Sequence, residues 1–304
     1  MNRLALAHAA AAIAALSAGT AVVVTRFVVG EIEPLSLVFY RYLISVICFL
    51  PLLPALWPRD HVSLSAVAKI GVLGILFFVL FPWAFNASLA INPAARGAVG
   101  LATIPIQTLL VAAVFGREQL SFGKVLGVLL AFCGIAIAFG AAAFGQGLSD
   151  YLRGDALMLL GVLCAAVYSV FSRPTLMRYG ALFVTALGMM IAVVALVPVM
   201  AVTHGGMIPL PVLSTRGWVG LVLLGTVSGT IQFSLFMWAL RSLPPTTTVL
   251  YLTLNPLTAM VLGIVLLGEV LAAELVVGVG LVLTGILINN GLLSVMKGAV
   301  KAGS

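Results

Sequence analysis

Charged residues are scarce in this chain. Only 8% of its 304 residues are Asp, Glu, Lys or Arg, whereas 63% are hydrophobic. Soluble domains carry about 25% charged residues, and no soluble fold could bury this much apolar surface. The composition therefore excludes a soluble protein and indicates an integral membrane protein that lies in a lipid bilayer.

Histidine and cysteine are also rare. The three His residues are dispersed singly, and Cys48, Cys133 and Cys164 all fall inside apolar runs. A metal site needs several such ligands close together, and a disulfide framework needs cysteines in pairs. Gly-rich phosphate loops and Ser/His/Asp sets are missing as well. We therefore expect no metal, no cofactor and no enzymatic activity.

Basic residues outnumber acidic ones, with 15 Lys and Arg against 8 Asp and Glu. They are scattered along the chain, so a nucleic-acid partner is not expected, and those at span ends act as topology signals. The first residues resemble a signal peptide, but their apolar run continues to about Val29, which is too long for one. This segment is predicted to be the first membrane span.

A spanning helix needs about 20 apolar residues, which leaves room for ten spans with short loops. Turn signals such as Asn92-Pro93 and Pro244-Pro245 separate them. The predicted spans are residues 5–28, 35–57, 66–88, 93–114, 121–143, 154–173, 181–203, 217–240, 245–267 and 271–293.

One stretch of the chain occurs twice. Residues 101–137 align without a gap with residues 252–288, 151 positions later. The identities include Pro105/Pro256, Glu118/Glu269, Gly127/Gly278 and Gly134/Gly285. The offset is almost half of the chain, so we predict two five-helix units, residues 1–147 and 148–304.

The distribution of Lys and Arg predicts how these units are oriented. With the N-terminus in the cytoplasm, ten basic residues fall in cytoplasmic segments and five, including Arg41, in outer ones. The positive-inside rule favours this orientation, with both termini cytoplasmic. Five spans per unit is an odd number, so the second unit is inverted. Inverted repeats are typical of transporters whose substrate site lies between the repeats.

These features resemble a known family. Each unit has a fourth span with a proline, a turn of the type Gly116-Arg117-Glu118 or Gly268-Glu269, and a fifth span with glycines seven apart. This pattern resembles the drug/metabolite transporter superfamily, EamA type, over the whole chain. The overall sequence is similar to bacterial aromatic amino-acid exporters of the YddG type. The resemblance implies a helical transporter of ten spans that moves small organic metabolites.

Candidate substrate residues lie on corresponding spans of the two units. Pro105 and Pro256 each remove an amide donor, so the freed carbonyls are expected to face a cavity or form a hinge. Aromatic and amide side chains near them could make an apolar pocket with a few polar anchors. The alternative is an aromatic stripe that faces lipid or the core. The candidate substrate-binding residues are Phe78, Trp83, Gln107, Gln232, Trp238 and Tyr251.

Titratable groups are expected only at the ends of spans. All eight carboxylates fall there, and His8 is the only residue inside a span that titrates near pH 7. Glu118 and Glu269 each precede a span and are predicted to cap it. No Lys or Arg is expected in the middle of a span, which argues against a nucleotide-sugar substrate.

The sequence thus predicts an inner-membrane exporter of small molecules, with aromatic or other apolar amino acids favoured by the resemblance. Alternating access without an evident proton-coupling residue is the expected mechanism, and no protein partner is required. A drug or nucleotide-sugar exporter is the alternative within transport. Other classes are an integral-membrane enzyme that modifies lipids and a structural or receptor-like membrane protein.

Overall fold

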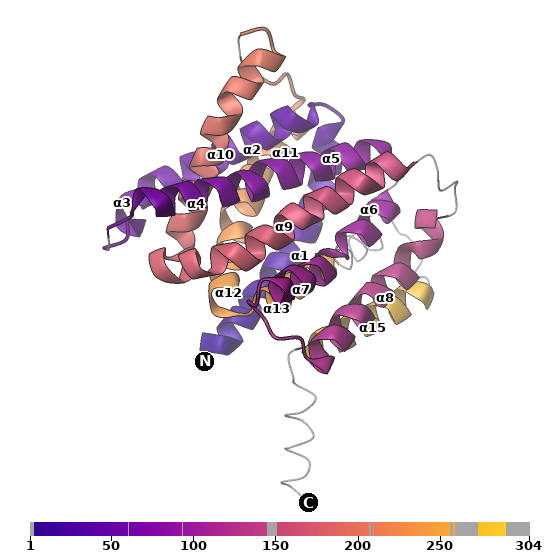
Figure 1. Cartoon of the computed structure of the whole chain (residues 1–304). Helices are drawn as coiled ribbons and strands as arrows, with labels where there is room; N and C mark the ends of the chain where they lie inside the picture. The colour runs from indigo at the N-terminus through magenta and orange to yellow at the C-terminus, as the bar shows by residue number, and fades with distance from the viewer. Residues whose placement is uncertain are drawn as a thin grey trace, which may run out of the picture.

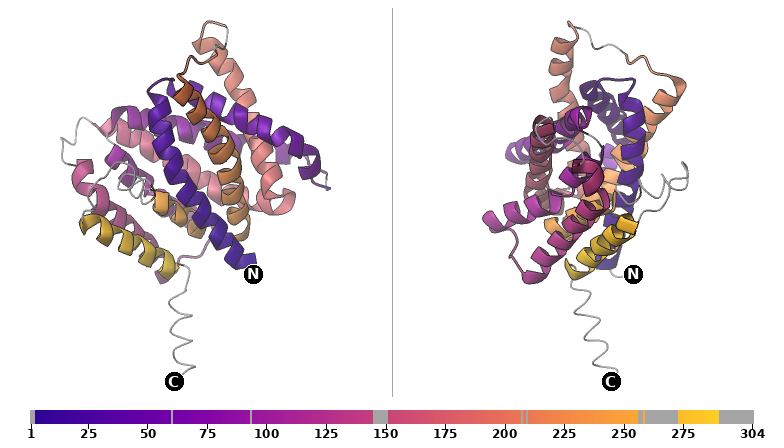
Figure 2. Two further views of the ribbon diagram at one scale, coloured as in Figure 1. Left: turned by 180° about the vertical axis from the view of Figure 1, so that it is seen from behind. Right: turned by 90° about the vertical axis from the view of Figure 1, so that its right-hand side faces the viewer.

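The computed structural model describes residues 3–59, 61–92, 94–144, 151–206, 208, 210–255, 258 and 273–289, and all regular structure in these residues is helical. Figure 1 shows the helices packed as one bundle. The N-terminal end of α1 and the C-terminal end of α15 lie at the same end of the molecule (Figure 2).

The described residues of the first half of the chain form ten helical segments. These are α1 (Arg3–Val29), α2 (Pro34–Phe49), η1 (Leu50–Leu52), α3 (Leu53–Leu56), α4 (Leu64–Ile75), η2 (Leu76–Leu80), α5 (Phe81–Ile91), α6 (Ala94–Leu101), α7 (Ile104–Val114) and α8 (Phe122–Phe144).

The described helices of the second half follow the same order. They are α9 (Leu152–Tyr179), α10 (Ala181–Thr203), α11 (Thr215–Leu223), η4 (Leu224–Gln232), α12 (Phe233–Ser242), α13 (Pro245–Leu250), η5 (Tyr251–Leu254) and α15 (Ala273–Asn289).

Every predicted span contains at least one of these helices. In the ninth, 245–267, the described residues are those up to Asn255 and Thr258, so Pro256 lies outside them, as does Glu269. Six of the helical stretches are long and apolar enough to cross a membrane, and three shorter apolar helices lie at Val99–Val114, Phe122–Ile137 and Val276–Asn289. The predicted all-helical membrane fold is confirmed.

The third and eighth spans share an uncommon local structure. Both contain a π-helical segment, η2 in the first and η4 in the second. Both also begin with a serine cap, since Ser63 accepts a hydrogen bond from the N–H of Ala66 and Ser214 accepts one from Gly217. Ser63 and Ser214 are 151 positions apart, so the repeat extends to these helix starts. π-Helical turns occur frequently at functional sites.

The fourth span is interrupted near its proline. α6 ends at Leu101 and α7 begins at Ile104, with Pro105 in its first turn. Proline fits the first turn of a helix, because its missing N–H would have no intrahelical partner there. The carbonyl of Leu101 therefore receives no helical hydrogen bond from Pro105. The ninth span likewise changes from α13 to the 3₁₀ turn η5 just before residue 256.

The two halves pack reciprocally. α2 packs on η4 in the eighth span, and α10 of the other half packs on α4 in the third. α8 and α15 lie side by side, with Gly127 against Gly285 and Gly134 against Gly278. Since Gly127 is equivalent to Gly278 and Gly134 to Gly285, each contact is the exchanged copy of the other. Such exchange is the mark of an approximate two-fold axis between the halves.

Candidate functional site

A cavity with a volume of about 120 Å³ lies between the two halves. Its lining comes from seven spans of both halves. The lining residues are Ala14, Ala18, Ala21, Thr25, Arg41, Tyr42, Phe77, Phe81, Pro82, Phe85, Asn86, Leu101, Ile104, Ala165, Ser169, Ser228, Gln232, Phe233, Phe236, Val249, Leu252 and Asn255.

Most of the lining consists of equivalent residues from the two halves. Each of these pairs is 151 positions apart, which is the repeat offset. The pairs are Ala14/Ala165, Ala18/Ser169, Phe77/Ser228, Phe81/Gln232, Pro82/Phe233, Phe85/Phe236, Leu101/Leu252 and Ile104/Asn255. A cavity lined in this way lies on the approximate two-fold axis. It therefore occupies the place between the repeats where transporters of this architecture bind substrate.

The two halves line the cavity with different chemistry. In four of the pairs the first half contributes an apolar residue and the second half a polar one. These pairs are Ala18/Ser169, Phe77/Ser228, Phe81/Gln232 and Ile104/Asn255. The cavity thus suits a ligand that has both an apolar and a polar part.

The apolar part of the lining is an aromatic cluster around Phe77. Its ring stacks on Tyr168 at 4.3 Å between centroids and on Phe81 at 5.7 Å, and it meets Phe233 edge to face at 5.6 Å. Phe85 extends the cluster from Phe81, at 6.1 Å. Packed rings in these geometries offer a rigid surface for an apolar or aromatic group.

The polar part contains a chain of hydrogen bonds that begins at Arg41 of α2. Its Nη2 donates to Oγ of Ser228 at 2.7 Å, and that hydroxyl donates to Oε1 of Gln232 at 2.8 Å. The guanidinium also lies over the rings of Tyr42, at 5.5 Å, and Phe233, at 5.8 Å. Among the residues that the structure describes, no carboxylate forms an ion pair with Arg41.

The EamA-like transporter family matches residues 5–140 and again residues 152–291. The chain belongs to the EamA-like transporter family. The double match agrees with the two halves of the fold and with the cavity between them.

Several relatives of this EamA-like transporter carry transporter names. An uncharacterized transporter of Archaeoglobus fulgidus is 24% identical over 89% of this chain and 93% of its own length. A Streptantibioticus cattleyicolor protein named as a probable terminal-alkyne amino-acid exporter is 29% identical over 65% of this chain and 64% of its own. A solved crystal structure has a TM-score of 0.76 at 21% identity, covering 94% of this chain and 98% of its own, which supports the fold.

Of the predicted substrate-binding residues, Gln232 lies on the cavity. Phe78 is fully buried behind it, where its ring packs edge to face on Tyr42 at 5.4 Å. Trp83 is 38% exposed on the outer side of α5. Trp238 is partly buried against both hydrophobic clusters of the core.

The remaining candidates lie near the interruptions of the fourth and ninth spans. Nε2 of Gln107 lies 3.5 Å from the carbonyl of Leu159, and Pro105 is buried in α7. The hydroxyl of Tyr251 lies 3.0 Å from Nδ1 of His8 on α1. The side chains of Gln107, Pro105 and Tyr251 are not among the described cavity-lining residues. Their neighbours Leu101, Ile104, Leu252 and Asn255 are.

The expectation that every basic residue lies near the end of a span is wrong for Arg41. Its position in the sequence, seven residues from Pro34 at the start of α2, grouped it with the outer basic residues. In the structure it turns inward to the cavity because Ser228 of η4 accepts its hydrogen bond. A basic residue a full two turns inside an apolar span is the signal that could have identified it.

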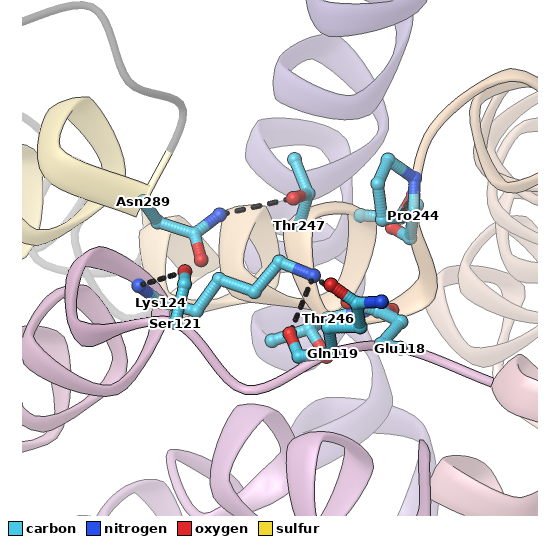
Figure 3. Close-up of polar contacts among 9 residues, drawn as sticks. Glu118, Gln119, Ser121, Lys124, Pro244, Thr246, Thr247 and Asn289 are labelled. Carbon is cyan, nitrogen blue, oxygen red and sulfur yellow. Dashed lines mark hydrogen bonds and ion pairs between the residues drawn. The ribbon is translucent and has the colours of Figure 1, made fainter. Parts of the chain in front are cut away.

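Glu118 caps a different helix from the one expected. Its Oε1 accepts a hydrogen bond from the N–H of Thr246 in α13 at 2.9 Å, and its Oε2 pairs with Nζ of Lys124 at 2.7 Å. Figure 3 shows this cluster where the α7–α8 turn meets the start of α13. Ser121 instead caps α8, accepting from the N–H of Lys124 at 3.4 Å. The carboxylate of Glu118 thus joins the two halves and does not cap the helix that follows it in the sequence.

Proposed function

We propose that this EamA-like transporter exports amino acids with aromatic or other apolar side chains across the inner membrane. The observation that carries the proposal is the cavity between the halves, with an aromatic cluster on one part and neutral amide and hydroxyl groups with Arg41 on the other. An apolar amino acid has the matching parts, a hydrophobic side chain and a zwitterionic head. The name of the relative from Streptantibioticus cattleyicolor, an amino-acid exporter, supports the same substrate class.

Alternating access is the proposed mechanism. The reciprocal packing of the halves gives two similar arrangements in which the cavity would open to one side or the other. Substrate held by both halves would favour the closed intermediate, since a ligand shifts a conformational equilibrium by its differential affinity for the states.

The proposed orientation in the membrane has both termini in the cytoplasm, and the distribution of Lys and Arg supports it. Single cysteines at Arg59 and Leu210, in a variant without the native cysteines, should react with an impermeant thiol reagent from opposite sides of the membrane. Labelling of both from the same side would contradict this orientation.

The transport proposal is tested by counterflow in proteoliposomes. Vesicles loaded with unlabelled L-phenylalanine should take up external labelled L-phenylalanine transiently, and vesicles without protein should not. Competition by an excess of L-leucine or propargylglycine should reduce the uptake, whereas L-lysine should not. Absence of counterflow for every apolar amino acid would refute the proposal.

A nucleotide-sugar exporter is the alternative that Arg41 makes worth testing. A nucleoside diphosphate sugar carries about two negative charges, and Arg41 is the one cation among the described lining residues. A single guanidinium matches one carboxylate more closely than a diphosphate. Competition by a nucleoside diphosphate sugar, but not by L-leucine, would favour the alternative.

A further inference from the structure

Two residues of the cavity lining each carry a buried polar atom that has no hydrogen-bond partner among the described residues. Within the described part of the chain, Nε of Arg41 and Oδ1 of Asn255 are buried and have no hydrogen bond. The other buried atoms of this kind belong to residues outside the cavity lining. A buried donor or acceptor without a hydrogen bond costs free energy. The presence of one such donor and one such acceptor in the residues of a single cavity therefore suggests a ligand that binds both.

The two atoms are chemically complementary to an amino acid. Nε of Arg41 is a charged donor, and an α-carboxylate is an acceptor that a guanidinium can bind through two parallel N–H groups. Oδ1 of Asn255 is a neutral acceptor, and an α-ammonium is a donor without any acceptor capacity. A zwitterion therefore supplies what both atoms lack.

The surroundings of Arg41 fit a carboxylate rather than an internal ion pair. Nη2 is already held by Ser228, which fixes the guanidinium in place, while Nε remains free of hydrogen bonds within the described residues. Its guanidinium lies over the rings of Tyr42 and Phe233, which shield part of it from water. An anion bound here meets a cation that is pre-oriented and partly desolvated, which strengthens the interaction.

Asn255 occupies a position suited to an ammonium group. It follows the 3₁₀ turn η5 and is 7% exposed. Its equivalent in the first half is Ile104, so the acceptor is present on only one side of the two-fold axis. The ligand head would therefore bind in a single orientation, with its side chain toward the aromatic cluster.

We propose that Arg41 and Asn255 form the head-group subsite of this cavity, with Arg41 binding the α-carboxylate of the substrate and Asn255 its α-ammonium group. The assignment rests on the proposed transport of amino acids. Arg41 belongs to the first half of the chain and Asn255 to the second, so a bound amino acid links the two halves. Ser228 and Gln232 position the guanidinium and do not themselves need to touch the ligand.

The test measures binding of three related ligands to the purified protein by calorimetry. L-Phenylalanine has both head groups, 3-phenylpropionate lacks the ammonium, and 2-phenylethylamine lacks the carboxylate. Arg41→Gln should weaken the first two by about 10- to 100-fold, the range for a hydrogen bond to a charged group, and leave 2-phenylethylamine unchanged. Arg41→Lys should restore part of the loss, because it keeps the charge but not the planar fork.

Asn255→Leu should affect the other pair of ligands, those that carry an ammonium group. Binding of L-phenylalanine and 2-phenylethylamine should weaken by about 10-fold or more, while 3-phenylpropionate binds as in the wild type. Arg153→Gln removes the same charge at an exposed site and should change none of the three affinities. A purely structural role of Arg41 or Asn255 would instead weaken all three ligands alike.

The outcomes separate this subsite from the transport proposal. Counterflow of L-phenylalanine together with equal losses for all three ligands, or with no loss, would overturn the subsite and leave the transport function standing. If Arg41→Gln weakened only the ligands with a carboxylate and Asn255→Leu only those with an ammonium group, but no counterflow occurred, the result would support the subsite and refute transport of phenylalanine. Failure of the wild type to bind any ligand that bears a carboxylate would overturn the subsite as well.

Discussion

The carboxylate of Glu118 binds the first turn of α13, where Oε1 accepts a hydrogen bond from the N–H of Thr246 at 2.9 Å. Glu118 belongs to the first half of the molecule and Thr246 to the second. A comparable contact joins the halves just after the C-terminal end of α1, where Glu31 accepts hydrogen bonds from the N–H and the hydroxyl of Ser214 at 2.7 and 2.8 Å. Each contact places a carboxylate at a helix N-terminus, where it is electrostatically favoured.

Glu118→Ala should destabilise the protein. The side chain of Glu118 is only 4% exposed, and its removal leaves the N–H of Thr246 and the ammonium of Lys124 without this partner. We expect a loss of about 1–3 kcal/mol in the free energy of unfolding, with a smaller loss in Glu118→Gln, since an amide oxygen can still accept from Thr246. Thermal unfolding in detergent measures both. Glu274→Gln, at an exposed site of α15, is the control, and equal effects at the two positions would contradict the assignment.

Alanine substitutions of Gly134 in α8 and Gly280 in α15 should change the stability of the protein in opposite directions. A Cβ added to Gly134 would lie 2.5 Å from the carbonyl oxygen of Gly278, so Gly134→Ala requires the two helices to move apart. Overpacking of this kind costs about 1–3 kcal/mol. Gly280 has open space around the same position, and Gly280→Ala should stabilise the helix by up to about 1 kcal/mol. Thermal unfolding of the two variants measures both effects. Similar destabilisation by both substitutions would show that α8 and α15 do not pack in this way.

The repeat and the helices could be predicted from the sequence because their signals are local. A span is a long apolar run, and the recurrence of Pro105, Gly127 and Gly134 at one offset indicates the duplication without any knowledge of packing. The contacts of these glycines show that the fifth and tenth spans pack closely against each other.

The direction of individual side chains could not be predicted in the same way. Trp83 and Phe85 are two residues apart on one helix and therefore lie on roughly opposite faces of it. Phe85 lines the cavity, and Trp83 is 38% exposed. The π-helical segment η2 lies just before them and changes the angular register of the span. Arg41 was equally hard to place, because its inward direction depends on Ser228 of the other half.

Phe85→Ala should reduce the affinity for apolar amino acids, whereas Trp83→Ala should not. Phe85 belongs to the aromatic cluster on the cavity, and burying an apolar side chain against it contributes about 1.5–3 kcal/mol, which corresponds to roughly 10- to 100-fold in affinity. Calorimetric titration of the two variants with L-phenylalanine gives the comparison. If Trp83→Ala caused the larger loss, the substrate site would lie near Trp83 instead of in this cavity.

Energy coupling can be predicted from the lining of the cavity. A proton-driven carrier places a titratable carboxylate or His along the substrate path, because its charge must change with binding. No Asp, Glu or His is among the described lining residues. His8 contacts Tyr251 outside the lining, and Glu31 and Glu118 bind helix N-termini near the ends of the molecule.

We therefore expect facilitated transport down the gradient of the substrate, with export driven by its internal concentration. Proteoliposomes without a membrane potential should equilibrate L-phenylalanine and not accumulate it when only a pH difference is imposed. The potential must be absent because it biases a charged species by about 2.3 kcal/mol per charge per 100 mV. His8→Ala should exchange L-phenylalanine in counterflow as the wild type does. Accumulation driven by the pH difference in the wild type, and its loss in His8→Ala, would instead assign proton coupling to His8.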